Sequence, residues 1–413
     1  MKNRNVLISG ASVAGPALAY WLARYGFNPT VVELAPAPRG GGYAVDFRGR
    51  THLTVLEQMG ILSELRRLQT GGSPYRFIDE AGKEQASLPA EFAGGDVEVR
   101  RADLSAVLHS LTQETTEYLF NDSLAAITET AEGVHVTFER GEQRTFDLVV
   151  GADGLHSNVR RLAFGPEAHF NSFLGYYIAR WDLANHLDVG RTALSYNVPG
   201  KLASIAGDHQ DNTRASTFFV FASELLNYDR HDIEQQKQLL TDTFAGVGWE
   251  VPDLLDTLPD APEFYFDSIS RIDLEHWAKG RVVLVGDAAY GATVGGMGVG
   301  SAVVGTYVLA AELAAAGGDH RDAFARYEQR LRGYVKECQK GGRRTAQFLA
   351  PSTRAKIRLR NRMLNSRVVM SMLLKQSQKV STSLDLSTYP AALHNQPRAA
   401  VARGTTGGSA THE

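Results

Sequence analysis

The sequence predicts an α/β fold in which a mostly parallel βαβ sheet carries an inserted antiparallel sheet and a C-terminal helix. Residues 5–34 alternate strand, helix and strand within about thirty residues, the length of a right-handed βαβ crossover. Residues 170–270 instead hold short, aromatic-rich runs that are typical of antiparallel strands. The strand-then-loop style of the N-terminus returns at residues 280–289, so we expect the first domain to be discontinuous.

The N-terminal elements follow from short apolar runs and from residues that start and stop helices. "NVLIS" at residues 5–9 is mostly apolar, which favours a buried parallel strand. The helix after it tolerates Pro16 in its first turn and stops at Gly26. The further elements expected here are a strand at 29–34, a glycine-rich loop at 36–49, a helix at 50–68, a strand and helix at 97–111, and a buried strand at 146–153.

The two domains are predicted to alternate along the chain. The first domain takes residues 1–72, 97–169 and 271–345, and the second takes 73–96 and 170–270. The apolar stretch at 301–316 carries Glu312 and is too short to span a bilayer, so we interpret it as a buried helix. Residues 352–380 are basic with helical periodicity. A helix that bridges the two domains is favoured there over one lying on a membrane. Residues 389–413 are expected to be disordered.

Composition excludes several classes of protein. A formal net charge of -3 gives no reason to expect nucleic acid or an anionic membrane as partner. Cys338 is the only cysteine, which excludes an intrachain disulfide and fits a reducing cytoplasm. The 12 histidines lack metal-ligand spacing, and no G-x-S-x-G elbow indicates a hydrolase. Without a signal-peptide pattern or a stable membrane span, the expected protein is cytoplasmic, and a monomer or homodimer.

The first motif, "GASVAG" at residues 10–15, lies between a strand and a helix, as a dinucleotide-binding turn does. Gly10 permits the tight turn, and Gly15 lets the helix pack closely on the strand. Ser12 stands where a second glycine is usual, and it is small enough to let pyrophosphate approach the helix N-terminus. Glu33 ends the second strand, where an acid holds ribose hydroxyls and disfavours a 2′-phosphate. This first domain is therefore expected to be Rossmann-like.

Two later motifs follow buried strands. In "GADGLHSNVR" (151–160), Asp153 could bind ribose or water, although a D-G turn alone is common. In "GDAAYGATVGGMGVG" (286–300), Asp287 ends a strand at the edge where ligands gather in α/β sheets. The glycines after it precede a long helix whose N-terminus can stabilise a developing anion.

Together the three motifs resemble those of the FAD-dependent aromatic hydroxylases of the p-hydroxybenzoate hydroxylase fold, the group A flavin monooxygenases. "VRRADLSAVL" is similar to the segment of that family in which an arginine contacts FAD, which corresponds to Arg101. "RGGGYAVDFRGRTHLTVLEQMGIL" is similar to the tetracycline-inactivating branch, and Arg39 and Asp46 match residues near its flavin. The resemblance implies FAD contacts from Gly10, Ser12, Val13, Ala14, Gly15, Glu33, Leu34, Arg39, Asp46, Arg101, Asp153, Asp287, Gly298 and Val299.

The family chemistry implies a monooxygenase that takes NADPH or NADH and O2 and hydroxylates an aromatic or polyketide-like molecule through a flavin C4a-hydroperoxide. The cofactor carries the chemistry, so no side chain is assigned as catalytic. The substrate is expected beside the inserted sheet, with Arg180, Tyr196, Phe219 and Phe221 as pocket candidates, although strand aromatics are mostly core. A related flavin halogenase or prenyl reductase, and a non-catalytic flavin- or drug-binding protein, remain alternatives.

Overall fold

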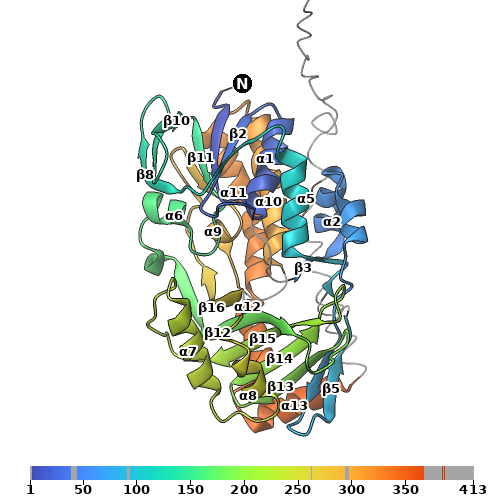
Figure 1. Ribbon diagram of the computed structural model, residues 1–413. Coiled ribbons are helices and arrows are strands. Elements are labelled where there is room, and N and C mark those ends of the chain that lie inside the picture. Colours follow the sequence, from blue (N-terminus) through green and yellow to red (C-terminus); the bar gives the residue numbers. More distant parts are fainter. Residues whose placement is uncertain are drawn as a thin grey trace, which may run out of the picture.

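The computed structural model describes residues 2–38, 44–90, 94–261, 263–293 and 297–366, together with Leu384 and Leu386. The upper part in Figure 1 is built on a sheet with the strand order β17-β18-β11-β1-β2-β7. Every pairing in it is parallel except that of β17 with β18. The strands are β1 (Asn5–Ser9), β2 (Asn28–Glu33), β7 (Glu117–Phe120), β11 (Leu148–Gly151), β17 (Ala278–Lys279) and β18 (Val282–Leu284).

Helices cover this parallel sheet, and α10 lies at their centre. It packs against α1, α2 and α11, while α1 also packs against α5. By length and apolar composition α10 alone among the described helices could cross a membrane, but 78% of it is buried inside the protein. The helices of this part are α1 (Ala14–Arg24), α2 (Gly49–Gln58), α3 (Leu62–Arg67), α5 (Arg101–Thr112), α6 (Asn158–Ala163), α9 (Asp287–Tyr290), α10 (Gly298–Ala315) and α11 (His320–Gln339).

Two small antiparallel ribbons flank the parallel sheet. β3 (Ala44–Phe47) pairs with β6 (Val97–Arg100), and β3 contacts α10. The other ribbon contains β8 (Leu124–Glu129), β9 (Val134–Phe138) and β10 (Arg144–Phe146). Both ribbons interrupt the strand–helix alternation without entering the parallel sheet.

The lower part in Figure 1 is a second sheet with the order β16-β12-β15-β14-β13-β4-β5. Its pairings are antiparallel except that of β13 with β4. The short helix η1 (Glu167–His169) leads into it. The strands are β4 (Tyr75–Ile78), β5 (Glu84–Leu88), β12 (Asn171–Ala184), β13 (Ala193–Val198), β14 (Lys201–Gly207), β15 (Arg214–Ala222) and β16 (Phe264–Ile272).

Helices cover both faces of the second sheet. Phe244 of α7 (Ile233–Phe244) and Leu254 of α8 (Val251–Asp256) pack with the aromatic side chains of one face. Ala346 of α12 (Gly342–Leu349) and Leu364 of α13 (Arg354–Leu364) pack with the side chains of the other. Because side chains alternate along each strand, the sheet supplies two separate apolar cores.

The predicted fold class is confirmed: a Rossmann-like parallel sheet, an antiparallel sheet and C-terminal helices form one molecule (Figure 1). The helix expected at 352–380 is described as α13 over Arg354–Leu364, and residues 367–383 lie outside the described residues. Further on, Leu386 is buried in the core of the parallel-sheet part, and the Thr51 hydroxyl donates to the Leu384 carbonyl at 3.1 Å. The tail expected at 389–413 also lies outside the described residues.

Candidate cofactor site at the carboxyl edge of the parallel sheet

Four residues singled out in the sequence meet at one edge of the parallel sheet. Gly10 follows β1, Glu33 ends β2, Asp153 follows β11 and Asp287 follows β18. Because these strands are parallel neighbours, their carboxyl ends lie side by side. This edge is where open α/β sheets bind ligands, so it is the candidate site.

The turn between β1 and α1 is too tight for side chains at its two glycines. Gly10 has φ +107°, and a Cβ there would lie 2.5 Å from the Ala152 carbonyl oxygen. A Cβ on Gly15 would lie 1.8 Å from the Gly10 carbonyl oxygen. Helix α1 then begins without a side-chain cap, since Val13 stands at the capping position. Its first N–H groups are oriented to bind an anion such as a pyrophosphate.

Ser12 links this turn to α5. Its hydroxyl accepts a hydrogen bond from Arg101 Nε at 3.2 Å, and its carbonyl accepts one from Ser105 Oγ at 3.2 Å. Ser105 was not predicted, and an isolated serine within a helix gives no sequence signal for this contact. The side chain at the middle of the turn therefore positions a cation beside the N-terminus of α1.

Asp287 is exposed to solvent at this edge of the sheet, and the space beside it is called the Asp287 recess. Surrounding protein nevertheless raises the pKa of Asp287 by desolvation, which the nearby Arg101 charge partly offsets. A group that is both accessible and desolvated is lined by protein on most sides. A Cβ on Gly298 would lie 3.6 Å from Asp287 Oδ1, so the uncapped N-terminus of α10 borders the recess with Val299 next to it. The structure thus brings Ser12, Arg101, Asp287 and Gly298 together.

Glu33 is buried and already receives two backbone hydrogen bonds. Its carboxylate accepts from Ala11 N at 2.8 Å and from Ala35 N at 3.0 Å. Carboxylate oxygens carry further lone pairs, so ribose hydroxyls could share them. Leu34, the next residue, has 57% of its surface exposed although it is apolar. This geometry suits the adenosine end of a dinucleotide.

The remaining predicted cofactor residues divide into three cases. Asp153 accepts from Val159 N at 3.0 Å and from the hydroxyls of Ser157 and Ser9, and burial raises its pKa. Its oxygens therefore hold the start of α6. Asp46 pairs with Arg48, and burial raises the pKa of Asp46 to about 6 against the opposing Arg48 charge. Arg39 lies outside the described residues.

His156 carries a half-buried charge that sequence reasoning missed, although it lies within the quoted 151–160 motif. Its Nδ1 lies 2.8 Å from Glu167 Oε1, and its Nε2 lies 3.0 Å from Asp267 Oδ2. Burial opposes protonation, but hydrogen bonds to Asp267 and Glu167 outweigh it and raise the pKa of His156 to about 9. Because Asp267 belongs to β16, this imidazolium joins the 151–160 segment to the second sheet.

The predicted substrate residues do not converge on the recess. Tyr196, Phe219 and Phe221 are buried in the core beneath α7 and α8, where Phe219 lies 4.7 Å from Phe244 by ring centroids. Their packing explains their aromatic character without a ligand. Arg180 alternates with these residues to the opposite face and pairs with Asp182 at 2.8 Å.

The segment between α9 and α10 ties the recess to the second sheet. Ile272 N donates to the Gly291 carbonyl at 2.9 Å, and Thr293 N donates to the Ser270 carbonyl at 3.1 Å. The Thr293 hydroxyl also donates to the Ser268 carbonyl at 3.2 Å. Edge strand β16 is therefore hydrogen-bonded to the segment that leads from Asp287 toward α10.

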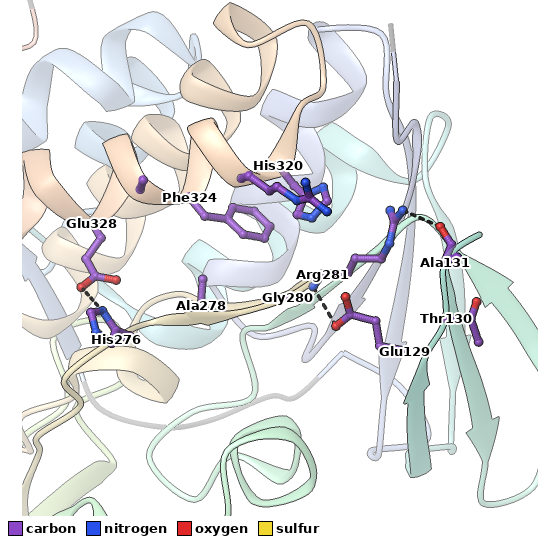
Figure 2. Close-up of a pocket in the computed structure, with 12 residues that line it drawn as sticks. Glu129, Thr130, Ala131, His276, Ala278, Gly280, Arg281, His320, Phe324 and Glu328 are labelled. Atoms are coloured by element: carbon purple, nitrogen blue, oxygen red, sulfur yellow. Dashed lines mark hydrogen bonds and ion pairs between the residues drawn. The ribbon is translucent and has the colours of Figure 1, made fainter.

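A separate cavity of about 490 Å³ lies between α11, β8 and the strand ends that precede β18 (Figure 2). It occupies the amino edge of the parallel sheet, opposite the recess. Two carboxylates that line it already have partners within the protein. Glu129 accepts from Arg281 N at 3.0 Å, and Glu328 Oε1 lies 3.3 Å from His276 Nδ1. Within the described ranges, no three His, Cys, Asp or Glu side chains are grouped to hold a metal ion.

A glycine turn at an uncapped helix, an acid ending β2 and a second uncapped helix beside Asp287 define a dinucleotide-binding α/β protein. The chain belongs to the family described as FAD binding domain, whose model matches residues 3–234. It is 38% identical to a flavin-dependent monooxygenase of Legionella longbeachae, over 83% of this chain and 88% of the relative. It is 41% identical to an uncharacterized protein of Mycobacterium tuberculosis, over 81% and 92%.

Solved structures agree with this assignment. The tetracycline destructase Tet(55) superposes with a TM-score of 0.81 at 35% identity, covering 94% of this chain and 99% of that one. Tet(51) gives the same TM-score at 32% identity. The protein is therefore an FAD-dependent monooxygenase with a small-molecule substrate, O2 and NAD(P)H as co-substrates, as the sequence predicted.

Proposed function

We propose that this monooxygenase hydroxylates an aromatic or polyketide-like molecule bound between the Asp287 recess and the second sheet. The observation that carries the proposal is the convergence of Ser12, Arg101, Asp287 and Gly298 at a recess whose wall continues into β16. A cofactor that extends from the α1 turn to the N-terminus of α10 would have its reactive end beside that sheet.

The chain's own residues would bind and orient FAD. The N-terminus of α1 and the Arg101 charge would stabilise pyrophosphate, and Glu33 would accept ribose hydroxyls. Backbone N–H groups of Gly298 and Val299 would donate to the ring, where the N-terminus of α10 favours negative charge. FAD supplies the redox chemistry when bound, and the protein's part is to orient the substrate and exclude water.

The substrate class rests on the relatives and on the second sheet. Tet(51) and Tet(55) are named tetracycline destructases, which favours a flat, polycyclic polyketide for this chain. Tyr75, Phe218 and Tyr265 lie half-buried on the sheet face away from α7 and α8. Aromatic side chains on that face would stack on a flat ring system. They replace Tyr196, Phe219 and Phe221 as the pocket candidates.

The proposal extends to the nicotinamide co-substrate, the cellular compartment and the oligomeric state. Asp46 would lie near the route of a transient NADPH or NADH, and Glu33 does not discriminate between them because it serves FAD. The half-buried Cys338 and a formal net charge of -3 fit a cytoplasmic protein without a nucleic-acid partner. A monomer or homodimer is expected.

The test is a substrate panel of phenols, tetracyclines and anthraquinones added to FAD-loaded protein. We expect one class to accelerate NAD(P)H oxidation and to yield a product heavier by one oxygen atom. A halogenated product or one that gains hydrogen would indicate a halogenase or a reductase. Tight ligand binding without stimulated turnover in O2 would indicate a binding protein and overturn the proposal.

A further inference from the structure

His52 of α2 is a fully buried histidine that neither the sequence motifs nor the proposed chemistry explains. Its ring packs edge-on between two aromatic rings, with centroid distances of 6.3 Å to Phe47 and 6.4 Å to Tyr334. These partners come from β3 and α11. His52 therefore lies where β3 and α2, which follow each other in the sequence, meet the distant helix α11.

The hydrogen bonds of His52 fix its tautomer. Arg48 N donates to Nδ1 at 3.0 Å, and a backbone N–H can only donate. Nε2 therefore carries the proton and donates to Tyr334 Oη at 2.6 Å, and Tyr334 in turn hydrogen-bonds to Cys338. Burial, together with the Arg48 charge, lowers the pKa of His52 to about 4, so the ring is neutral at physiological pH.

The ring also lies directly against the first turn of α10. A Cβ on Gly300 would lie 2.0 Å from His52 Cε1 and 2.3 Å from Nδ1. Gly300 is two residues after Gly298, whose N–H is proposed to face the cofactor. On its other side, His52 holds the backbone of Arg48, which pairs with Asp46. A single side chain thus contacts both segments expected to border the flavin ring.

We propose that His52 is a positioning residue that sets the first turn of α10 against the Asp46–Arg48 segment, and thereby sets the affinity and reduction potential of FAD. Helix N-terminal donors stabilise charge only within the first turn, so a shift of that turn changes the field at the ring. This inference rests on the proposed placement of FAD, but it needs no assumption about the substrate.

A double-mutant cycle tests it with purified protein titrated with FAD. We expect His52→Ala to raise the Kd for FAD about tenfold and to shift the reduction potential of bound flavin, because the first turn of α10 loses its support. Gly300→Ala should raise the Kd for FAD further, since its Cβ would clash with His52. The double variant should raise the Kd by less than the product of the two single effects, because removing the imidazole ring relieves the clash.

His320→Ala is the matched control. His320 is also buried and bonded to one side chain, Asn3, but it lines the cavity at the opposite edge of the sheet. The His320→Ala variant should have a lower Tm, but its Kd for FAD should change by less than about twofold. His52→Gln takes the place of His52→Ala in the cycle if the latter does not fold.

Two results would overturn the proposal. One is an unchanged FAD affinity and potential in the folded His52 variant. The other is that Gly300→Ala changes the Kd for FAD by the same factor in the wild type and in the His52 variant. Since no substrate or turnover enters the measurement, a failure of the proposed substrate class would leave these results unaffected.

Discussion

At the residue scale, the turn between β1 and α1 contains one position that only glycine can occupy and another that accepts a side chain. Gly15 must lack a side chain, because a Cβ would lie 1.8 Å from the Gly10 carbonyl oxygen. Ser12 has no such restriction, and its hydroxyl accepts from Arg101. We expect Ser12→Gly to retain FAD with a several-fold weaker Kd, and Gly15→Ala to lose FAD or fail to fold. The flavin-to-protein absorbance ratio after gel filtration checks both, and tight FAD binding by Gly15→Ala would refute this account.

Asp287 provides a second prediction at the same scale. Asp287 is exposed to solvent, beside Gly298 and within the field of Arg101. We expect Asp287→Ala to purify with little flavin and to bind added FAD at least about tenfold more weakly, because the carboxylate proposed to border the cofactor is lost. Asp273→Ala, an exposed carboxylate paired with Arg271, is the control. Stoichiometric flavin in Asp287→Ala would contradict the assignment.

The candidate cofactor residues could be singled out in the sequence because each ends or follows a strand in a short, local pattern. Gly10, Glu33 and Asp287 needed only the order of strand, turn and helix to be placed at one edge. Tyr196, Phe219 and Phe221 could not be placed in this way. Alternation shows that they share a face of a strand, but it does not show that α7 and α8 cover that face.

At the scale of elements, His156 joins the loop before α6 to β16, and its charge makes that junction depend on pH. Its pKa of about 9 in the folded protein lies above the ordinary value of 6.5. The interaction therefore stabilises the fold fully below pH 6.5 and is lost as the pH rises through 9. We expect the Tm advantage of wild type over His156→Gln to be a few degrees near pH 6.5 and to vanish above about pH 10.

The difference in Tm between the two proteins isolates this histidine, because its partners Glu167 and Asp267 stay ionised over this pH range and groups away from it titrate equally in both. Thermal melts in matched buffers across that range are sufficient. A Tm difference that stays constant with pH would show that His156 acts through packing rather than charge.

Arg360 anchors α13 to the second sheet. Its guanidinium lies 3.8 Å from the Phe77 ring centroid, and it donates to the Phe348 carbonyl and to Asn197 Oδ1, each at 2.9 Å. We expect Arg360→Ala to lower the free energy of unfolding by about 2–4 kcal/mol, because buried acceptors lose their donor. Limited proteolysis should then cut near α13 first. Arg358→Ala, exposed on the same helix, is the control, and equal protease resistance in both variants would contradict this role.

Elements with strong local signals were predictable, whereas junctions between them were not. The long apolar run of α10 and the βαβ order of the N-terminus indicated their structure directly. The sequence gives no sign that Arg360 would meet Phe77 or that His52 would meet Gly300, because the partners are far apart along the chain. Such contacts depend on how the elements pack.

At the scale of the whole molecule, the recess belongs to both sheets. The parallel sheet contributes its carboxyl edge, and β16 of the second sheet bonds to the segment between Asp287 and Gly298. A boundary of this kind allows one sheet to hold the cofactor while the other holds the substrate next to it. The arrangement is consistent with the proposal that the second sheet contributes to the substrate site.

The central claim, that the protein transfers one atom of O2 to an aromatic or polyketide-like substrate, is tested most directly by following that atom. FAD-loaded protein, NAD(P)H and a tetracycline or related polyketide are incubated under isotopically labelled O2. The molecular mass of the product is then measured by mass spectrometry. We expect substrate-stimulated NAD(P)H oxidation and a product that carries one labelled oxygen atom. A product without labelled oxygen, across the whole substrate panel, would contradict it.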